Sequence, residues 1–349
     1  MTFRRISVLL TSLLLISGCS QRTPEQQFLH ATTSQVIQPA YRDLAKQSQL
    51  LLATITEHCP TDDEASRTQW RNTMASWQRI QAIQFGPIRD LNLAWEIQFW
   101  PDKKNLVARK NRSLLQEEQA ITLERLQKAS VASRGLWSLE YLLFDAQTKT
   151  LSTPQRRCQL QAAAAENLAS VTQQLSAAWD EKYAAVLTTP GETNDDFPAS
   201  GNAIAAIIDS YLTHLEIIKG RKLAPALGIN NRAKRSNPYL LESWRSQHSL
   251  TNLRLNLEAL QRLMHQGGLE DFLMAKQQPE LAAEINAHLQ QLLEKLPTAE
   301  AGLFALINEQ DVDAITAVYQ QLPELIALFK RELPGKLDLQ MGFNSNDGD

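Results

Sequence analysis

Hydrolysis by a zinc peptidase is the first chemistry to test, because it needs histidines and a carboxylate at fixed spacing. The usual pattern is His-Glu-x-x-His on one helix, which places two imidazoles on the same face. No two histidines of this sequence lie four residues apart; the six are His30, His58, His214, His248, His265 and His288. Glu284 and His288 have helical spacing, but such a pair is typical of a solvated helix face. The sequence therefore lacks this zinc motif.

Ser246 and His248 are close enough in sequence to suggest a serine nucleophile with its base, which normally stands on a strained turn. Their neighbourhood is instead typical of a helix entrance, where Ser246 or Ser249 would cap the first turn. Glu242 is then either a capping acid or a residue of a cleft. We therefore do not expect peptidase activity.

A further candidate acid lies in an irregular, aromatic-rich stretch, residues 85–105. Glu96 stands between Trp95 and Trp100, where it would be a partly buried carboxylate. Trp100, like Trp77, is either a core side chain or part of a cleft wall. A long insertion of this kind inside a helical domain is either a packed loop or part of a site.

The N-terminus carries the elements of a bacterial lipoprotein signal. Arg4 and Arg5 precede a short apolar run, Ile6 to Ser17, and small residues stand directly before Cys19. We expect residues 1–18 to be cleaved, Cys19 to be lipidated, and residues 19–27 to form a tether to the membrane. The alternative is an ordinary signal peptide that contains a cysteine. Ser20 after the cysteine favours the outer membrane, with the protein facing the periplasm.

The charge and the cysteine content limit the expected partners and the possible covalent links of the chain. Cleavage removes two positive charges from the formal net charge of −3, leaving −5, so nucleic acid is not an expected partner. Cys59 and Cys158 remain after Cys19 is used. In an oxidising compartment they are either a disulfide or two separate buried thiols.

The elements that position these residues are predicted to be helices throughout, an all-α fold. Apolar residues recur every three or four positions in four long runs: residues 160–186, 204–218, 250–264 and 281–296. A Pro-, Gly- and acid-rich segment interrupts the pattern before residue 200. We therefore expect a first helical bundle at 28–190, a linker at 191–200, a second bundle at 201–343 and a disordered tail at 344–349.

Four segments occur in an order that resembles one known family. They are Phe85-Gly86-Pro87 with Trp100-Pro101, then Arg134 to Phe144, Lys222 to Gly228, and Glu242 to Leu250. Together they resemble the signatures of the imelysin family, also called iron-regulated periplasmic proteins. The resemblance implies two four-helix bundles related by duplication, a cleft between them, a role linked to iron, and a peptidase label.

The central signature departs from the family pattern Gly-x-His-x-x-Glu, since here it contains Gly135, Trp137 and Glu140. Positions 137 and 140 share a helix face, but an indole cannot ligate a metal. Glu140 is then either a site carboxylate or a hydrogen-bond partner of a neighbouring helix. The predicted cleft is lined by Gly135, Trp137, Glu140, Glu242, Ser246, Glu96 and Trp100, with Glu140 and Glu242 as candidate metal ligands.

These expectations favour a non-catalytic binding protein in iron acquisition, anchored to a membrane by lipid. The ligand is an iron species or a protein partner from iron uptake or redox chemistry, and the residues do not specify a cofactor beyond iron as a candidate. The alternatives are a degenerate periplasmic peptidase and a scaffold for a redox or transport complex.

Overall fold

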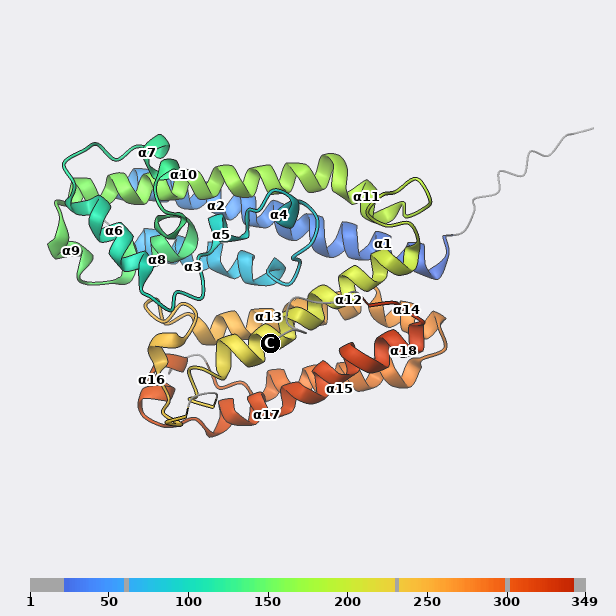
Figure 1. The fold of residues 1–349 in the computed structure, drawn as a ribbon. Helices are drawn as coiled ribbons and strands as arrows, with labels where there is room; N and C mark the ends of the chain where they lie inside the picture. The colour runs from blue at the N-terminus through green and yellow to red at the C-terminus, as the bar shows by residue number, and fades with distance from the viewer. Residues whose placement is uncertain (1–21, 60–62, 230–231, 299–301, 342–349) are drawn as a thin grey trace, which may run out of the picture.

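In the computed structural model, the described residues are 22–59, 63–229, 232–298 and 302–341, and their regular elements are all helical. The predicted cleavage site, the lipidation site Cys19 and the tail 344–349 lie outside these ranges. The helices lie in two tiers, one above the other in Figure 1. None of the helices in the described ranges has the length and apolar character needed to cross a membrane.

The upper tier is built on the long helices α2, α3 and α10, with shorter helices at one end (Figure 1). Its elements are α1 (Pro24–Ala31), π-helical turn η1 (Thr32–Ile37), α2 (Gln38–His58), α3 (Asp63–Ile80), α4 (Pro87–Asp90), α5 (Ala94–Ile97), α6 (Leu106–Gln116), α7 (Leu123–Lys128), 3-10 turn η2 (Val131–Ser133), α8 (Gly135–Phe144), α9 (Thr148–Leu151), α10 (Pro154–Ala178), π-helical turn η3 (Trp179–Tyr183) and α11 (Ala184–Thr188). The long apolar stripe predicted at 160–186 runs along the continuous rod α10–η3–α11.

The lower tier holds the C-terminal half of the chain (Figure 1). Its elements are α12 (Ser200–Ile217), π-helical turn η4 (Ile218–Leu223), 3-10 turn η5 (Pro238–Leu240), α13 (Ser249–His265), α14 (Leu269–Ala275), α15 (Pro279–Lys295), α16 (Leu303–Asn308), α17 (Asp313–Ala327), π-helical turn η7 (Leu328–Glu332) and α18 (Leu333–Leu337). The three other stripes predicted from periodicity fall on α12, α13 and α15.

Side-chain caps explain where helices begin. Thr23 accepts a hydrogen bond from the Gln26 backbone, and the Gln26 side chain returns one to the Thr23 backbone, which starts α1 at Pro24. Helical structure therefore begins inside the segment 19–27 that the sequence analysis assigned to a tether. Thr153 caps α10 before Pro154 by accepting a hydrogen bond from the Arg156 backbone N–H.

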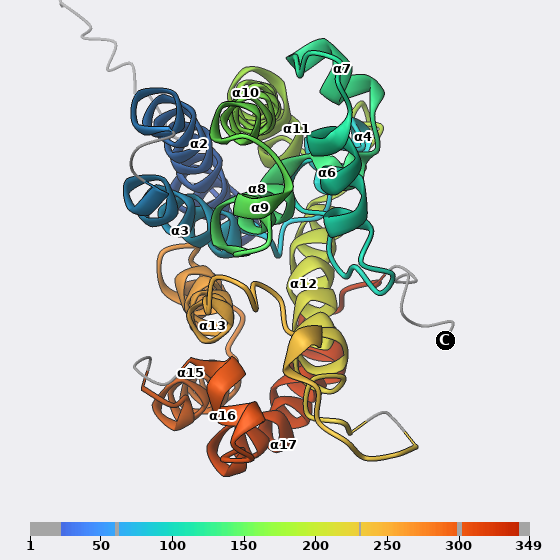
Figure 2. The same ribbon diagram turned by 90° about the vertical axis from the view of Figure 1, so that its left-hand side faces the viewer.

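The two tiers share one apolar core. Helix α3 of the upper tier packs on α13 of the lower tier, an arrangement visible end-on in Figure 2. A single connected set of buried apolar side chains runs through both tiers, from Trp70 and Trp77 on α3 to Leu257 and Leu260 on α13. The division into two bundles at 191–200 stays a prediction, because packing is continuous across the boundary.

A disulfide ties the upper tier at one end. Cys59 follows α2 and Cys158 lies in the first turns of α10, with their Cα atoms 5.8 Å apart. The bond joins two helices that also pack along their length. Of the two alternatives left open by the sequence, the structure contains the disulfide.

Candidate functional site

Glu140 and Ser246 meet where the two tiers touch. Helix α8 is buried on almost every side, and Glu140 within it has no exposed surface. Its Oε1 accepts hydrogen bonds from the Ser246 backbone N–H and from the Ser246 hydroxyl, both at 2.9 Å. Its Oε2 has no hydrogen-bond partner among the described residues. Burial raises the pKa of Glu140 to about 7, against the lowering effect of these bonds.

Gly135 allows helix α8 to begin against the chain that follows α4. Its φ is +68°, a left-handed conformation that favours glycine. A Cβ atom here would lie 2.4 Å from the Ile97 carbonyl oxygen and 2.5 Å from that of Glu96. No side chain fits this position without a shift of the neighbouring chain, so Gly135 permits the close packing of the two segments.

Lys222 and Glu242 form a buried ion pair beside Glu140. The π-helical turn η4 carries Lys222, whose Nζ lies 2.8 Å from Glu242 Oε2. The same nitrogen donates to oxygens of Gln78, Gln81 and Asn256 at 2.6 to 2.9 Å. The ammonium group is thus enclosed by four oxygen atoms, which compensates for the loss of water.

Amide groups complete the surroundings of Glu242. Its Oε1 accepts from Gln98 at 2.9 Å, from Gln78 at 3.2 Å and from Gln81 at 3.3 Å. Its Oε2 also accepts from Asn252 at 3.1 Å. Although burial alone would raise the pKa of Glu242, Lys222 and these amides hold it below its usual value. We call this set the Lys222 cluster: Lys222, Glu242, Gln78, Gln81, Gln98, Asn252 and Asn256.

The segment 242–249 connects the two buried acids. Asn252, which donates to Glu242, also donates to the Ser243 hydroxyl at 3.0 Å. The Ser246 hydroxyl in turn lies 3.1 Å from the Ser243 carbonyl oxygen. Glu140 and Glu242 therefore belong to one buried polar region between the tiers, and both are enclosed rather than set on an open wall.

The donor set does not fit a resident metal ion. Both oxygens of Glu242 are occupied by Lys222 and amide donors, and Lys222 itself supplies the positive charge. Glu140 offers a single unpartnered oxygen. Within the described ranges, no group of three or more His, Cys, Asp or Glu side chains is placed to hold a metal. The geometry gives Glu140 and Glu242 no role as a pair of metal ligands.

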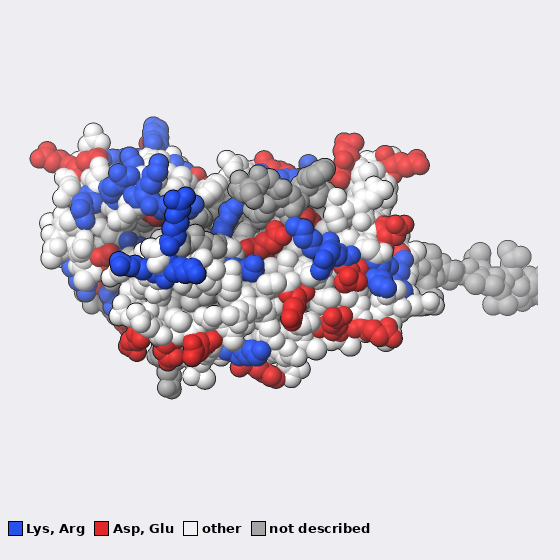
Figure 3. Space-filling view, turned by 60° about the horizontal axis from the view of Figure 1, so that its bottom comes forward, with Lys and Arg blue, Asp and Glu red and all other residues white. Residues whose placement is uncertain are grey.

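A cavity of about 570 Å³, which we call the basic cavity, opens beside α8. Its walls come from the start of α6 and from α8 in the upper tier, and from the segment before α13 in the lower tier. The lining residues are Asp102, Lys103, Lys104, Asn105, Ala108, Arg112, Trp137, Tyr141, Asp145, Gln147, Tyr239, Trp244 and Arg245. Lys and Arg side chains gather at the left of Figure 3, the end at which α6 lies in Figure 1. Trp137 thus lines a cavity whose mouth is cationic.

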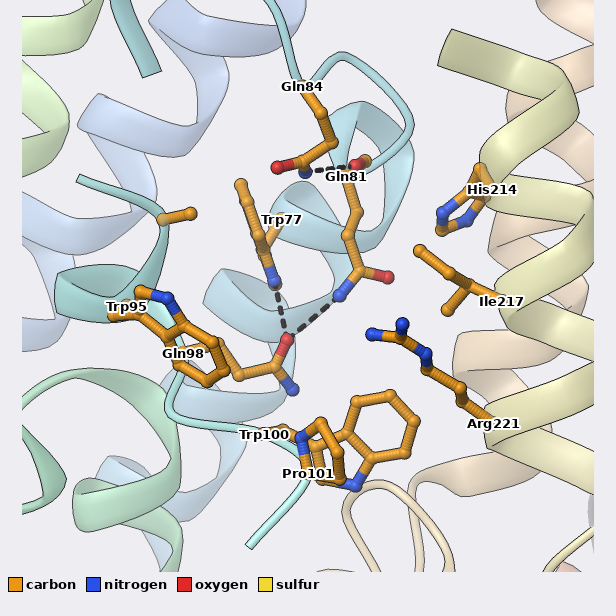
Figure 4. Close-up of a pocket in the computed structure, with 11 residues that line it drawn as sticks. Trp77, Gln81, Gln84, Trp95, Gln98, Trp100, Pro101, His214, Ile217 and Arg221 are labelled. Atoms are coloured by element: carbon orange, nitrogen blue, oxygen red, sulfur yellow. Dashed lines mark hydrogen bonds between the residues drawn. The ribbon is translucent and has the colours of Figure 1, made fainter. Parts of the chain in front are cut away.

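A second, smaller cavity of about 210 Å³ borders the Lys222 cluster. We call it the tryptophan cavity. In Figure 4, Trp77, Gln81 and Gln98 face His214, Ile217 and Arg221 across an open space, with Trp95, Trp100 and Pro101 along its edge. Gln81 and Gln98 also hold Glu242, so the cluster borders this cavity. Trp100, predicted as either core or cleft wall, lies here.

His214 is the titratable group of the tryptophan cavity that burial affects most. It is 4% exposed, and its Nε2 has no hydrogen-bond partner in the described part of the chain. Burial lowers the pKa of His214 to about 3, and the nearby Lys222 adds to this effect. The imidazole is therefore neutral at physiological pH.

The Glu96 side chain does not face the buried acids. Its carboxylate pairs with Arg134 and accepts from Asn167 at 3.2 Å. It is partly buried, as expected, but its partners fix the loop 85–105 to α10 and to the chain before α8. The sequence analysis placed Glu96 in the cleft; the structure gives its carboxylate a role in holding this loop.

Lys222 and the amides around it were absent from the candidate residues. One signal was available, because Lys222 follows Ile218 by four positions and so continues the apolar stripe of α12. A cation on a buried stripe needs a buried partner. Nothing in the spacing of Gln78, Gln81 and Gln98 indicates that they would meet it.

The fold and this site define an all-helical protein with an enclosed polar cluster between two tiers and two cavities, one of which borders the cluster. The imelysin family model (Peptidase M75) matches residues 37–329, and the chain belongs to this family. No match was found among curated proteins.

Two solved structures share the fold. An imelysin-like protein from Psychrobacter arcticum 273-4 superposes with a TM-score of 0.77 at 22% identity, covering 93% of this chain and 99% of that one. A protein described as an iron-regulated protein A precursor, from Parabacteroides distasonis ATCC 8503, gives a TM-score of 0.70 at 17% identity, covering 89% and 95%. These likenesses establish the all-α imelysin-like fold.

Proposed function

We propose that this chain is an exported, lipid-anchored binding protein of iron acquisition that carries out no catalysis. Membership of the imelysin family and the likeness to a protein described as iron-regulated support the link to iron. The signal at Ile6–Cys19 supports export and anchoring. The disulfide Cys59–Cys158 is consistent with an oxidising compartment.

The ion pair between Lys222 and Glu242 is the main observation in favour of a protein that carries out no catalysis. A carboxylate that serves as base or metal ligand must have a free oxygen that a substrate or metal can reach. Glu242 has no such oxygen, because the side chain is buried and both of its carboxylate oxygens contact Lys222 or one of four amide groups. The polar groups of this region are arranged to hold the tiers together.

Ser246 supports the same proposal. Its hydroxyl lies against Glu140 and the Ser243 carbonyl, and its side chain is only 5% exposed. A serine nucleophile needs an imidazole or a similar base in reach and a path for the substrate. Here the serine orients a carboxylate instead.

Iron accumulation in cells tests the proposal. A strain lacking the gene is grown under iron limitation and complemented with the full-length chain or with Cys19→Ser. We expect the deletion to lower the uptake of radioactive iron, the wild-type gene to restore it, and the Cys19→Ser product to leave the membrane fraction. Unchanged uptake in the deletion strain would count against the role in iron acquisition.

A digestion assay addresses the peptidase alternative. The purified protein is incubated with unfolded casein, with and without a chelator, and we expect no cleavage in either sample. Cleavage that the chelator abolishes would overturn the non-catalytic proposal and would favour a metallopeptidase.

A further inference from the structure

We infer that the basic cavity binds a small organic anion that carries an aromatic ring. The inference deepens the proposed function, and the part that concerns iron rests on it: the iron would reach this protein as the chelate of such an anion, not as a bare ion.

The wall of the cavity has a net formal charge of +2, because four cations, Lys103, Lys104, Arg112 and Arg245, outnumber the two acids Asp102 and Asp145. Asp102 accepts hydrogen bonds from the backbone N–H groups of Leu106 and Val107, at 2.7 and 2.8 Å, and so caps α6. Asp145 pairs with Arg245, with 3.1 Å between Oδ2 and Nε. Among the described residues, neither carboxylate forms an ion pair with Lys103, Lys104 or Arg112.

Lys103, Lys104 and Arg112 supply the remaining charge. In the described part of the chain, no acidic side chain lies within ion-pairing distance of these three. Arg112 donates to the neutral Gln147 amide at 3.2 Å. Three cations at the mouth of one cavity attract an anion and can bind carboxylate or phenolate oxygens.

The walls of the cavity are rich in aromatic side chains. Trp137, Tyr141, Tyr239 and Trp244 all line it. The Trp244 ring already contacts the Arg245 guanidinium, 4.3 Å from its centroid, and stacks with Phe304. Aromatic side chains next to cations favour a planar anion over a flexible aliphatic one.

The size of the cavity limits the ligand. Trp137 is 4% exposed, and its Nε1 atom has almost no accessible surface, so the ring lines the cavity through its other atoms. The volume of about 570 Å³ suits a molecule of one or two rings.

Calorimetric titration of the full-length lipoprotein in detergent tests the inference. The probes are 2,3-dihydroxybenzoate, its ferric chelate, benzamide as a neutral ring, and citrate as an anion without a ring. We expect saturable binding of 2,3-dihydroxybenzoate, weaker binding of citrate, and none of benzamide. No saturable heat with the aromatic anion, or equal binding of benzamide, would overturn the inference.

Variants locate the binding. Lys104 and Arg112 are exposed, so the double variant Lys104→Gln, Arg112→Gln keeps the packing and should weaken binding of the aromatic anion about tenfold or more. Lys128→Gln, at an exposed lysine outside the cavity, is the matched control and should change nothing. Unaltered affinity in the double variant would contradict the assignment.

The ferric chelate separates the two proposals. Binding of both the free anion and its chelate supports the cavity and the iron role together. Binding of the free anion alone, with the same sensitivity to Lys104 and Arg112, keeps the cavity assignment and contradicts the role in iron acquisition.

Discussion

Lys222 Nζ and Glu242 Oε2 lie 2.8 Å apart, with side chains that are only 5% and 2% exposed. Both residues belong to the lower tier, yet the amides that surround them include Gln78 and Gln81 at the end of α3 and Gln98 after α5, all in the upper tier. The ion pair therefore links the two tiers through hydrogen bonds to these amides. Its removal should affect the whole fold.

Glu242→Gln should lower the free energy of unfolding by about 3 to 5 kcal/mol, because it leaves the Lys222 ammonium buried without a counter-charge. Urea denaturation measures the change. Glu124→Gln is the matched control: it breaks the Glu124–Lys128 pair, which is exposed, and should cost less than about 1 kcal/mol. Equal small losses in both variants would mean that Lys222 finds water or another partner.

Glu140 should make the protein less stable as the pH rises from about 5 to 7. Its pKa is raised from 4.5 to about 7, so in this window the folded state binds more protons than the unfolded state, and folding is favoured on the acid side. Glu140→Gln keeps an acceptor for Ser246 but does not titrate. The stability of the wild type relative to this variant should fall by up to about 1.4 kcal/mol per pH unit across the window. A flat difference would show that Glu140 has an ordinary pKa.

His214 should make the protein less stable as the pH falls below about 6. Its pKa is lowered from 6.5 to about 3, so between these values the unfolded state binds the extra proton and stability is lost as the pH falls. Against His214→Gln, the wild type should lose up to about 1.4 kcal/mol more per pH unit between pH 6 and 4. Denaturation curves at several pH values measure this difference. If the stability of the two proteins changed with pH in the same way, the His214 imidazole would be solvated and not buried.

Gly135→Ala should destabilise the fold by more than about 2 kcal/mol, since the new Cβ meets the Ile97 and Glu96 carbonyls and the φ is positive. Gly220→Ala is the control, because that helical glycine faces open space. It should be neutral or stabilising by up to about 1 kcal/mol. Thermal unfolding compares the two. A Gly135→Ala variant as stable as Gly220→Ala would contradict the close approach of the two segments.

The helices could be predicted from the sequence because their signals are local. The stripes on α10, α12, α13 and α15 need only the spacing of apolar residues, and Thr153 before Pro154 marks a start by its own chemistry. The beginning of α1 was missed, although Thr23 and Gln26 form a capping box. The expectation of a tether after Cys19 took precedence over that local signal.

The site was harder to predict because its contacts join distant residues. The family motif drew attention to Glu140 and Ser246, but only the packing of α8 on the segment before α13 shows that they bond to each other. Lys222 and Gln78 are 144 positions apart, and no local pattern relates them. Glu96 was recognised as partly buried, whereas its partner Arg134 follows from the path of the loop.

Titration of the purified protein with ferrous iron, without oxygen, most directly tests the claim that Glu140 and Glu242 do not ligate metal. We expect the wild type, Glu140→Gln and Glu242→Gln to give the same calorimetric trace, without a saturable metal site. A micromolar site in the wild type that either substitution abolishes would contradict it.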